Sequence, residues 1–263
     1  ETVEVTGRDD VSMEADETPF ARLIAAADEQ LAGLAQSGSR PWLLWLRSRG
    51  VPVPSVPPRE SLIEHVRLLD RGLGRLQKAI EHACGEGPLL FIVTAALGQS
   101  LGETVLRTER PSELERGSRL VEEFTHTPLL IQLRPGTIPG RARELVQTVD
   151  IGPTLLDWFG VPAADMRLDG RSLLPIVRAE SSTGREFICL GDGARQRAIR
   201  TEDFLLVTDE PPADGQPADP PRLYVQPDDR WQVNDVAGQS PDAVGRLEGL
   251  LEGFLRSQAA AGK

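Results

Sequence analysis

Lysine, histidine and cysteine are scarce in this sequence. Its 29 basic residues include only two lysines, Lys78 and Lys263, and the chain has three histidines and two cysteines. Cys84 and Cys189 are far apart, so we expect no disulfide framework and predict two buried free thiols. His65, His82 and His126 are too scattered to form a ligand set, and we expect each to be a structural histidine with satisfied hydrogen bonds.

Positive charge is also in short supply. Forty acidic residues face 29 basic ones, which gives a net charge of −11. Nucleic acids and anionic membranes are bound by clustered positive charge, so neither is an expected partner. No apolar run approaches the length of a membrane span and the start shows no signal-peptide pattern, which predicts a soluble chain of unknown compartment. Because the chain begins with Glu1 rather than Met, we interpret it as a processed product or a segment.

Short apolar runs bounded by glycine and proline indicate an α/β fold. Leu89 to Val93 is almost purely apolar, as expected of a strand buried on both faces of a parallel sheet. Residues 41–46 and 127–133 show the same pattern, so the three runs are predicted to be adjacent, mostly parallel strands of one sheet. Val3 and Val5 alternate with polar residues and suggest a short edge strand.

Helical periodicity separates these strands. Apolar residues at a spacing of 3.6 predict helices over residues 19–35, 59–83 and 144–159. The second helix is expected to turn one apolar stripe inward, formed by Leu62, Ile63, Val66, Leu69, Leu73, Leu76 and Ile80. The third is expected to turn inward Val149, Leu155, Leu156 and Phe159. Residues 51–58 are a proline-rich loop, residues 104–119 a polar surface loop, and residues 173–177 a short apolar segment.

The pattern changes in the last part of the chain. Short strands with tight turns are predicted over residues 186–190, 196–200, 204–208 and 222–225, followed by an amphipathic helix over 242–256. Strands followed by a helix indicate an antiparallel α+β subdomain. We therefore predict an α/β domain over residues 1–180 and a second subdomain over residues 181–263.

Several stretches resemble the sulfatase family of the alkaline phosphatase superfamily. VQTVDIGPTLLDWFGVP followed by DGRSLLP is similar to the family's helix and the D-G-x-S-L-x-P loop after it. LVEEFTHTPLLIQLRPG resembles its strand entry, HVRLLDRGLGRLQKAI the helix before its metal-bearing strand, and AIRTEDFLLV with RLYVQPDDRWQVNDVA its small C-terminal sheet. The resemblance covers roughly residues 40 to 256 and implies an alkaline-phosphatase-like sheet flanked by helices.

The resemblance also implies a chemistry, cleavage of sulfate or phosphate esters. The family uses a hydrated aldehyde made from Cys or Ser in a C/S-x-P-x-R motif, and a divalent cation, usually calcium. In the family this cation is held by Asp, Asn and His side chains, and hard oxygen ligands suit calcium or magnesium. The family's metal strand ends in T-x-D-[HN]-G-E, and its preceding strand is followed by P-H-x-P.

The residues at those positions do not match this chemistry. The Asp, His/Asn and Glu positions fall on Ala96, Leu97 and Gln99, and the His of the P-H-x-P loop falls on Pro52. Ala and Leu cannot ligate a cation, so we expect neither a metal nor another cofactor. These four are interpreted as degenerate family positions.

The nucleophile is not found in the expected place either. Neither cysteine fits the motif; Ser55 to Arg59 matches S-x-P-x-R by letters, but it lies in the proline-rich loop, well after the place the family requires. Ser55, Arg59 and His126, which enters a strand, are therefore weak candidates. Asp9-Asp10 is interpreted as a solvated turn, and Asp150, Asp169 and Arg171 as structural residues at a helix start and a turn.

Two classes of function follow. The first is a sulfatase-like protein without catalytic activity, with a structural role or a binding role toward a protein partner or an anionic ester. The second is a sulfuric or phosphoric ester hydrolase whose nucleophile and metal ligands lie upstream of residue 1. A regulatory subunit of an active homologue is a third alternative. Ala96 and Leu97 separate the first two, because an upstream nucleophile cannot restore the missing ligands.

Overall fold

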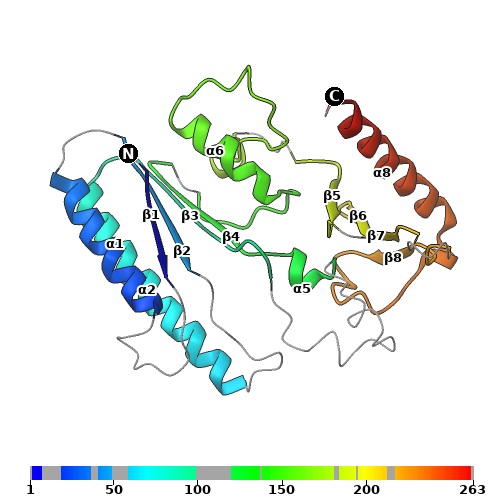
Figure 1. The fold of residues 1–263 in the computed structure, drawn as a ribbon, viewed down its shortest axis with the longest axis horizontal. Helices are drawn as coiled ribbons and strands as arrows, with labels where there is room; N and C mark the ends of the chain where they lie inside the picture. The colour runs from blue at the N-terminus through cyan, green and yellow to red at the C-terminus, as the bar shows by residue number, and fades with distance from the viewer. Residues whose placement is uncertain are drawn as a thin grey trace. The chain divides into compact units, whose positions relative to one another are not determined.

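A computed structural model describes residues 2–7, 19–36, 41–48, 59–98, 120–136, 138–180, 184–193, 195–211 and 217–261 (Figure 1). The chain divides into two compact units. Unit 1 contains Glu1–Phe91 and Gln132–Pro135, and unit 2 contains Ile92–Ile131 and Gly136–Lys263. None of the described helices combines the length and the apolar character that a membrane span requires.

Unit 1 contains two strands in parallel and two long helices. Strand β1 (Thr2–Gly7), the predicted edge strand, pairs in parallel with β2 (Leu43–Ser48), with Val5 opposite Leu46. Helices α1 (Pro19–Gln36) and α2 (Arg59–Cys84) lie side by side (Figure 1). Their facing sides form one core cluster, whose buried members are Ile24, Ala27, Leu31, Leu76 and Ile80.

The first turns of α2 differ from the prediction. Gly72 packs so closely on the ring of Phe20 that a Cβ atom there would lie 2.3 Å from a ring carbon. Phe20 lies in the first turn of α1, so the start of α1 meets the middle of α2. Ile63 and Val66, which precede this contact by more than one helical turn, are 41% and 55% exposed rather than inward. The periodicity of the stripe is helical over its whole length, but only its later half is buried.

The central strands are present but do not form one sheet among the described residues. Strand β3 (Leu89–Thr94) pairs with β4 (Leu129–Arg134), whereas β2 pairs with β1. The prediction that the three runs form a single sheet is therefore wrong for the described residues. Apolar runs predict burial but not which strand is the neighbour. Residues of β2 and β3 still pack on the same cluster of α1 and α2.

Proline fixes two boundaries that the periodicity placed too early. Strand β4 begins at Leu129 rather than residue 127, after Pro128, which has no backbone N–H for a ladder. The helix predicted over 144–159 is a 3-10 turn, η1 (Thr148–Asp150), followed by α6 (Ile151–Trp158). This start places Pro153 in the first helical turn, where its missing N–H is not required.

The shorter α6 also exposes side chains predicted to face inward. Val149 is 48% and Phe159 is 37% exposed, because they lie just before and just after the helix rather than on its packed face. The remaining short helices of the described chain are α5 (Glu122–Thr125), η2 (Ala237–Gln239) and α7 (Leu174–Val177), which occupies the predicted apolar segment.

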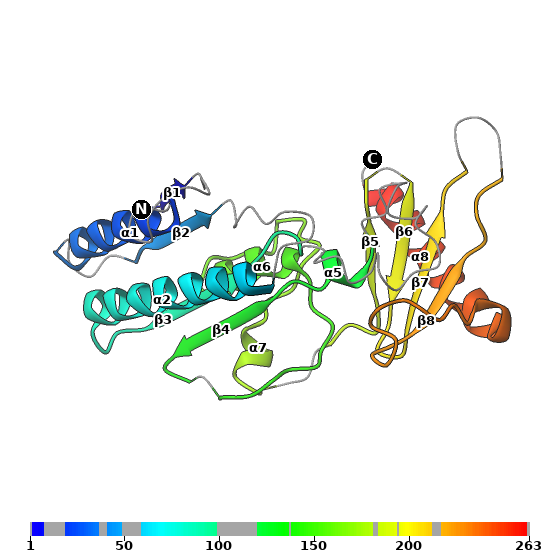
Figure 2. The ribbon, with the colours of Figure 1, turned by 90° about the horizontal axis from the view of Figure 1, so that it is seen from below.

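The C-terminal part of unit 2 is the predicted antiparallel sheet and helix. The strands β5 (Ile188–Gly191), β6 (Gln196–Arg200), β7 (Phe204–Asp209) and β8 (Arg222–Val225) pair in chain order, each antiparallel to the next. Helix α8 (Pro241–Ala261) runs along one face (Figure 2). Alternation along the strands gives the sheet two apolar faces. One packs on Leu247 and Leu251 of α8, and the other on Leu120, just before α5.

Both cysteines are free, but they are half-buried rather than fully buried as predicted. Burial raises the pKa of the Cys189 thiol to about 11. Burial also raises the pKa of Cys84, and the nearby charge of Arg134 offsets only part of that rise. Since the thiolate is the reactive form, neither cysteine has the environment of an activated nucleophile.

Candidate functional site

The end of β3 is held in place by backbone contacts to the segment around α5. The Thr94 hydroxyl donates to the carbonyl oxygen of Pro128 at 2.9 Å, and the Gly98 N–H donates to that of Phe124 at 2.9 Å. A Cβ atom on Gly98 would lie 1.8 Å from the carbonyl oxygen of Glu123, so only glycine fits this approach. The turn between these two anchors contains Ala96 and Leu97.

The side chains in this turn do not fit a divalent cation. Ala96 is exposed and the Leu97 side chain is 64% exposed, and neither carries an atom that can coordinate a metal. Calcium and magnesium require several oxygen ligands, usually including carboxylates. Throughout the described ranges no group of three or more His, Cys, Asp or Glu residues is arranged to hold a metal ion. We therefore derive no chemistry through a metal from these residues.

Three of the sequence-predicted site residues, Pro52, Ser55 and Gln99, lie outside the described residues. Arg59 is the first residue of α2, and His126 directly follows α5. His65 lies in α2, and its Nδ1 is buried with no hydrogen-bond partner among the described residues, where the expectation of a satisfied histidine is wrong for this atom.

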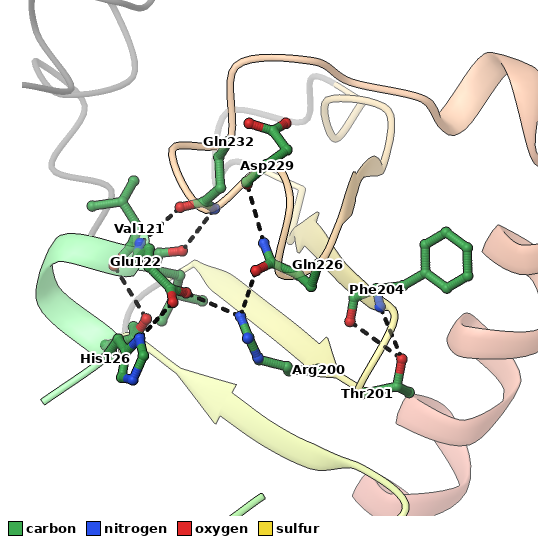
Figure 3. Close-up of polar contacts among 11 residues, drawn as sticks. Val121, Glu122, His126, Arg200, Thr201, Phe204, Gln226, Asp229 and Gln232 are labelled. Carbon is green, nitrogen blue, oxygen red and sulfur yellow. Dashed lines mark hydrogen bonds and ion pairs between the residues drawn. The ribbon is translucent and has the colours of Figure 1, made fainter. Parts of the chain in front are cut away.

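Glu122 is the centre of a polar cluster where α5 meets the C-terminal sheet (Figure 3). Its Oε1 lies 2.7 Å from Nδ1 of His126, and its Oε2 accepts a hydrogen bond from Arg200 Nη1 at 3.0 Å. The same Nη1 donates to the side-chain oxygen of Gln226 at 3.0 Å. The Glu122 side chain is 14% exposed and that of His126 is 72% exposed. The cluster thus combines a largely buried carboxylate with an outward imidazole.

The two groups shift each other's pKa in opposite directions. Burial alone would raise the pKa of Glu122, but the hydrogen bond to His126 and the charge of Arg200 outweigh it, so the pKa is lowered. The hydrogen bond to Glu122 raises the pKa of His126, against the opposing effects of burial and of the Arg200 and Arg230 charges. The geometry therefore favours an imidazolium next to a carboxylate, an ion pair that persists to a higher pH than a free histidine would allow.

Gln232 joins the loop after β8 to α5. Its side-chain oxygen accepts the Glu122 N–H at 2.7 Å, and its amide nitrogen donates to the Leu120 carbonyl oxygen at 3.3 Å (Figure 3). Its backbone has a φ of 53°, a left-handed conformation that is uncommon for a residue other than glycine. The Asp229 carboxylate supports the turn by accepting two backbone N–H groups, at 2.9 and 2.8 Å. The sequence motifs contain these residues but do not reveal their contact across 110 positions.

A second polar cluster surrounds Asp150, which is fully buried. Its carboxylate accepts the backbone N–H groups of Gln147 and Arg171, each at 2.8 Å. Arg185 completes the cluster as a bidentate partner, with distances of 2.7 and 2.5 Å. Burial opposes ionisation, but these hydrogen bonds together lower the pKa of Asp150. Asp150 thus fastens the start of α6 to the 169–174 loop, a structural arrangement in which Arg171 contributes its backbone.

The loop after α6 is fixed by further contacts of the same kind. The Thr154 hydroxyl donates to the Asp150 carbonyl oxygen at 2.6 Å and accepts the Leu173 N–H at 2.9 Å. Gly170 lies so close to Val149 that a Cβ atom would be 2.0 Å from its carbonyl oxygen. The DGRSLLP stretch is thus held by close backbone contacts, and the Ser172 hydroxyl also donates to the Asp157 carboxylate at 2.5 Å.

Comparison with known proteins finds sulfatases among the proteins that this chain resembles. No family model matches the chain. Arylsulfatase K of Danio rerio is 30% identical over 146 residues, a match that covers 52% of this chain and 27% of that protein. N-acetylglucosamine-6-sulfatase of Homo sapiens is 40% identical over 65 residues, covering 24% of this chain and 12% of that protein. The matched part is thus well under half the length of either relative.

Solved structures extend the likeness to most of the chain. A protein from a Bacteroides thetaiotaomicron locus for the metabolism of multiple glycosaminoglycans has a TM-score of 0.66 at 18% identity, covering 91% of this chain and 55% of that one. A structure in complex with its substrate D-glucosamine-2-N,6-O-disulfate has a TM-score of 0.54 at 23% identity, covering 73% of this chain and 39% of that one. The chain is therefore similar in sequence to sulfatases over about half of its length, and in fold to solved sulfatase structures over most of it.

Proposed function

We propose that this chain is a sulfatase-like protein that retains the fold and lacks the metal-dependent hydrolysis, and that it has a structural or binding role. The observation that carries the proposal is the end of β3, where Ala96 and Leu97 stand at the positions that the family resemblance assigns to metal ligands. An alanine and a leucine supply no ligand atom, and the acidic neighbours that could replace them are not gathered in the described residues.

The contacts that hold the turn after β3 support the view that this chain differs from the family pattern in the side chains of residues 96 and 97, and not in the path of the backbone. Thr94 and Gly98 hold both sides of the turn through carbonyl oxygens, which do not depend on what residues 96 and 97 carry. Leu97 is mostly exposed, so its apolar side chain does not contribute to a core in exchange for the missing ligand. These contacts are compatible with a protein that keeps the backbone path of the turn after the loss of metal-dependent hydrolysis.

The alternative is a sulfuric or phosphoric ester hydrolase whose nucleophile and metal ligands lie upstream of residue 1. The observation that favours it is the partial coverage of the relatives, since 27% and 12% of their lengths are matched. Under this alternative the unmodified chain, in the context of the longer protein, would bind a cation and turn over an ester despite Ala96 and Leu97.

Calcium-dependent melting separates the two functions. We expect no shift in melting temperature between millimolar calcium and a chelator for the unmodified chain. A cation that binds the folded state at a hundredfold excess over its Kd would add about 2.7 kcal/mol of stability, which is readily measured. The variant with Ala96→Asp and Leu97→His restores two of the ligand types that the family resemblance assigns to this turn. A gain of calcium sensitivity in this variant would mean that the remaining oxygen ligands are supplied by residues outside the turn.

A matched control places the same two side chains elsewhere. Gln258→Asp with Ala259→His keeps the adjacent spacing, lies at the exposed end of α8 in the same unit and should gain no sensitivity to calcium. Turnover of an aryl sulfate and of an aryl phosphate is measured in parallel. A calcium shift in the unmodified chain that a chelator abolishes, together with release of the phenol, would refute the proposal.

A further inference from the structure

The outward side of helix α8 has a row of residues with almost no side chain. Gly245, Gly249 and Gly253 follow one another at intervals of four, and Ser257 continues the row. Residues four apart lie on the same side of a helix, so the three glycines form one narrow stripe, the glycine stripe. All three are exposed, and a Cβ atom added to any of them would meet open space.

The contacts of α8 with the rest of its unit do not explain these glycines. The helix packs on the C-terminal sheet through its other side, where Leu247 and Leu251 are buried (Figure 2). In a helix interior only proline is less favourable than glycine, because glycine loses the most backbone freedom on folding. Gly72 of α2, by contrast, is needed because the Phe20 ring leaves no room for a Cβ atom. The glycine stripe leaves the same kind of room on a face that the described residues do not cover.

Charged residues next to the glycine stripe are arranged symmetrically about Gly249. Arg246 precedes Gly249 by three residues and Glu252 follows it by three. Asp242 precedes it by seven residues and Arg256 follows it by seven. All four are exposed, and within the helix Glu252 and Arg256 also lie 3.7 Å apart, with side chains 71% and 76% exposed. Each charge thus has a charge of opposite sign at the equivalent position beyond Gly249.

An antiparallel pair of α8 helices uses both features. A two-fold axis at Gly249 places each residue before it opposite the residue equally far after it in the second copy. Gly245 then faces Gly253 of the second copy, where the missing side chains allow the two backbones to approach closely.

The same axis pairs the charges. Arg246 faces Glu252 of the second copy, and Asp242 faces Arg256 of the second copy, so each of these facing pairs is attractive. A parallel pair in register would place every one of these charges opposite its own copy, which is repulsive. The charge pattern is therefore an observation independent of the glycines, and it selects both the partner and the direction.

We propose that the outward face of α8 is an interface with a second copy of this chain, packed antiparallel about Gly249. The partner is a second copy because the pattern of charges and glycines is complementary to itself. One helix face is smaller than the roughly 800 Å² per partner of a standard interface, so the dimer is weak and forms in proportion to concentration. The interface does not depend on whether the chain hydrolyses an ester.

The first test is analytical ultracentrifugation of the full chain over about 1–300 μM, a range suited to a small interface. We expect a monomer–dimer equilibrium. Gly249→Leu places a side chain on the axis and should weaken the dimer by at least about tenfold. It should also raise the melting temperature at the lowest concentration, because leucine is a better helix former than glycine. The matched control is Gly74→Leu, at an exposed position of α2 with equally open space, which should leave the dimer unchanged.

Exchange of charges tests the direction of pairing. Arg246→Glu alone should weaken the dimer by about tenfold, because two attractive pairs become repulsive, and Glu252→Arg alone should act in the same way. The double variant with both substitutions restores the pairs with their signs exchanged. It should therefore regain most of the affinity, although each single substitution lowers it.

Cross-linking locates the axis. Under mild oxidation Gly249→Cys should form a disulfide-linked dimer, since the two thiols meet on the axis. Gly245→Cys should not, because its two copies lie about 12 Å apart along the helix and a disulfide requires Cα atoms within about 7 Å. The unmodified chain, with Cys84 and Cys189, gives the background. A monomer over the whole concentration range, an unchanged dimer in Gly249→Leu, no recovery in the double charge variant, or equal cross-linking at 245 and 249 would each overturn the proposal.

Discussion

Replacing Asp150 with asparagine should destabilise unit 2 more than any surface change in it. Asparagine keeps the shape of the side chain but removes the charge that pairs with Arg185, whose side chain is 11% exposed. It also places an amide N–H₂ against one of the backbone N–H donors of Gln147 and Arg171. Removing one partner of a buried ion pair typically costs about 3–5 kcal/mol, and we expect a loss of that order.

The assay is urea unfolding followed by tryptophan fluorescence, since Trp158 lies in α6, directly after this cluster. Asp165→Asn, in an exposed turn, is the matched control and should change the free energy of unfolding by less than about 0.5 kcal/mol. A double-mutant cycle with Arg185→Gln isolates the pair. The double variant should be less destabilised than the sum of the single variants, by about 0.5–3 kcal/mol.

The pH dependence gives an independent check on the charge. The pKa of Asp150 is lower in the folded state than in the unfolded chain. Its contribution is therefore fully present above the unfolded pKa, about 3.9, and is lost as pH falls through the folded value. The difference between the unmodified chain and Asp150→Asn should shrink over that acidic range. A loss below about 1 kcal/mol, additive single variants, or a constant difference across acidic pH would each refute the reasoning.

Three further predictions concern the rest of the chain. Because the pKa of His126 is raised in the folded state, its contact with Glu122 contributes fully to folding stability below the unfolded pKa, about 6.5, and this contribution is lost as pH rises through the folded value. In a plot of urea midpoint against pH, His126→Gln should therefore flatten the fall over this range. An unchanged plot would contradict the argument. Gly98→Ala should lower the melting temperature because its Cβ meets a carbonyl of α5, whereas Gly249→Ala, with open space in α8, should raise stability by up to about 1 kcal/mol; equal effects would argue against the close approach. Leu247→Ala should cost about 2–5 kcal/mol in chemical unfolding, since this fully buried side chain joins α8 to the sheet, and a loss under 1 kcal/mol would mean that the helix is not packed there.

The sequence predicts the C-terminal sheet well because each part of it is a local pattern. Strands of four to six residues with alternating apolar positions are joined in chain order, so neighbours in sequence are neighbours in the sheet. The central strands are different. The sequence locates their apolar runs to within a few residues. It does not say which strand pairs with which, and the observed pairs, β2 with β1 and β3 with β4, depend on which strand edges are adjacent in the folded chain. An apolar run indicates burial but carries no information about the neighbouring strand.

The polar clusters show a similar limit. Asp150 is recognisable from the sequence as the start of a helix, but Arg185 lies 35 residues later in a stretch without a motif. Gln232 and Glu122 are 110 residues apart. The left-handed backbone position in this turn is occupied by Gln232 rather than by a glycine, which would have indicated a turn in the sequence. Contacts of this kind depend on the assembled fold, so no periodicity or spacing could have predicted them.

The contacts of the turn after β3 bear on the proposed loss of metal ligands. Its anchors are a threonine hydroxyl and a glycine N–H, and both reach main-chain carbonyl oxygens. Main-chain acceptors are supplied by any residue, so the path of the turn requires Thr94 and Gly98 but makes no demand on residues 96 and 97. A ligand lost there removes chemistry at little cost to folding. The Asp150 cluster is the opposite case, because there the buried charge itself joins the segments and its removal leaves an unpaired arginine. In this unit the contacts that fix the backbone do not involve the side chains of residues 96 and 97, so the proposed loss of metal ligands at the end of β3 is compatible with a persistent fold.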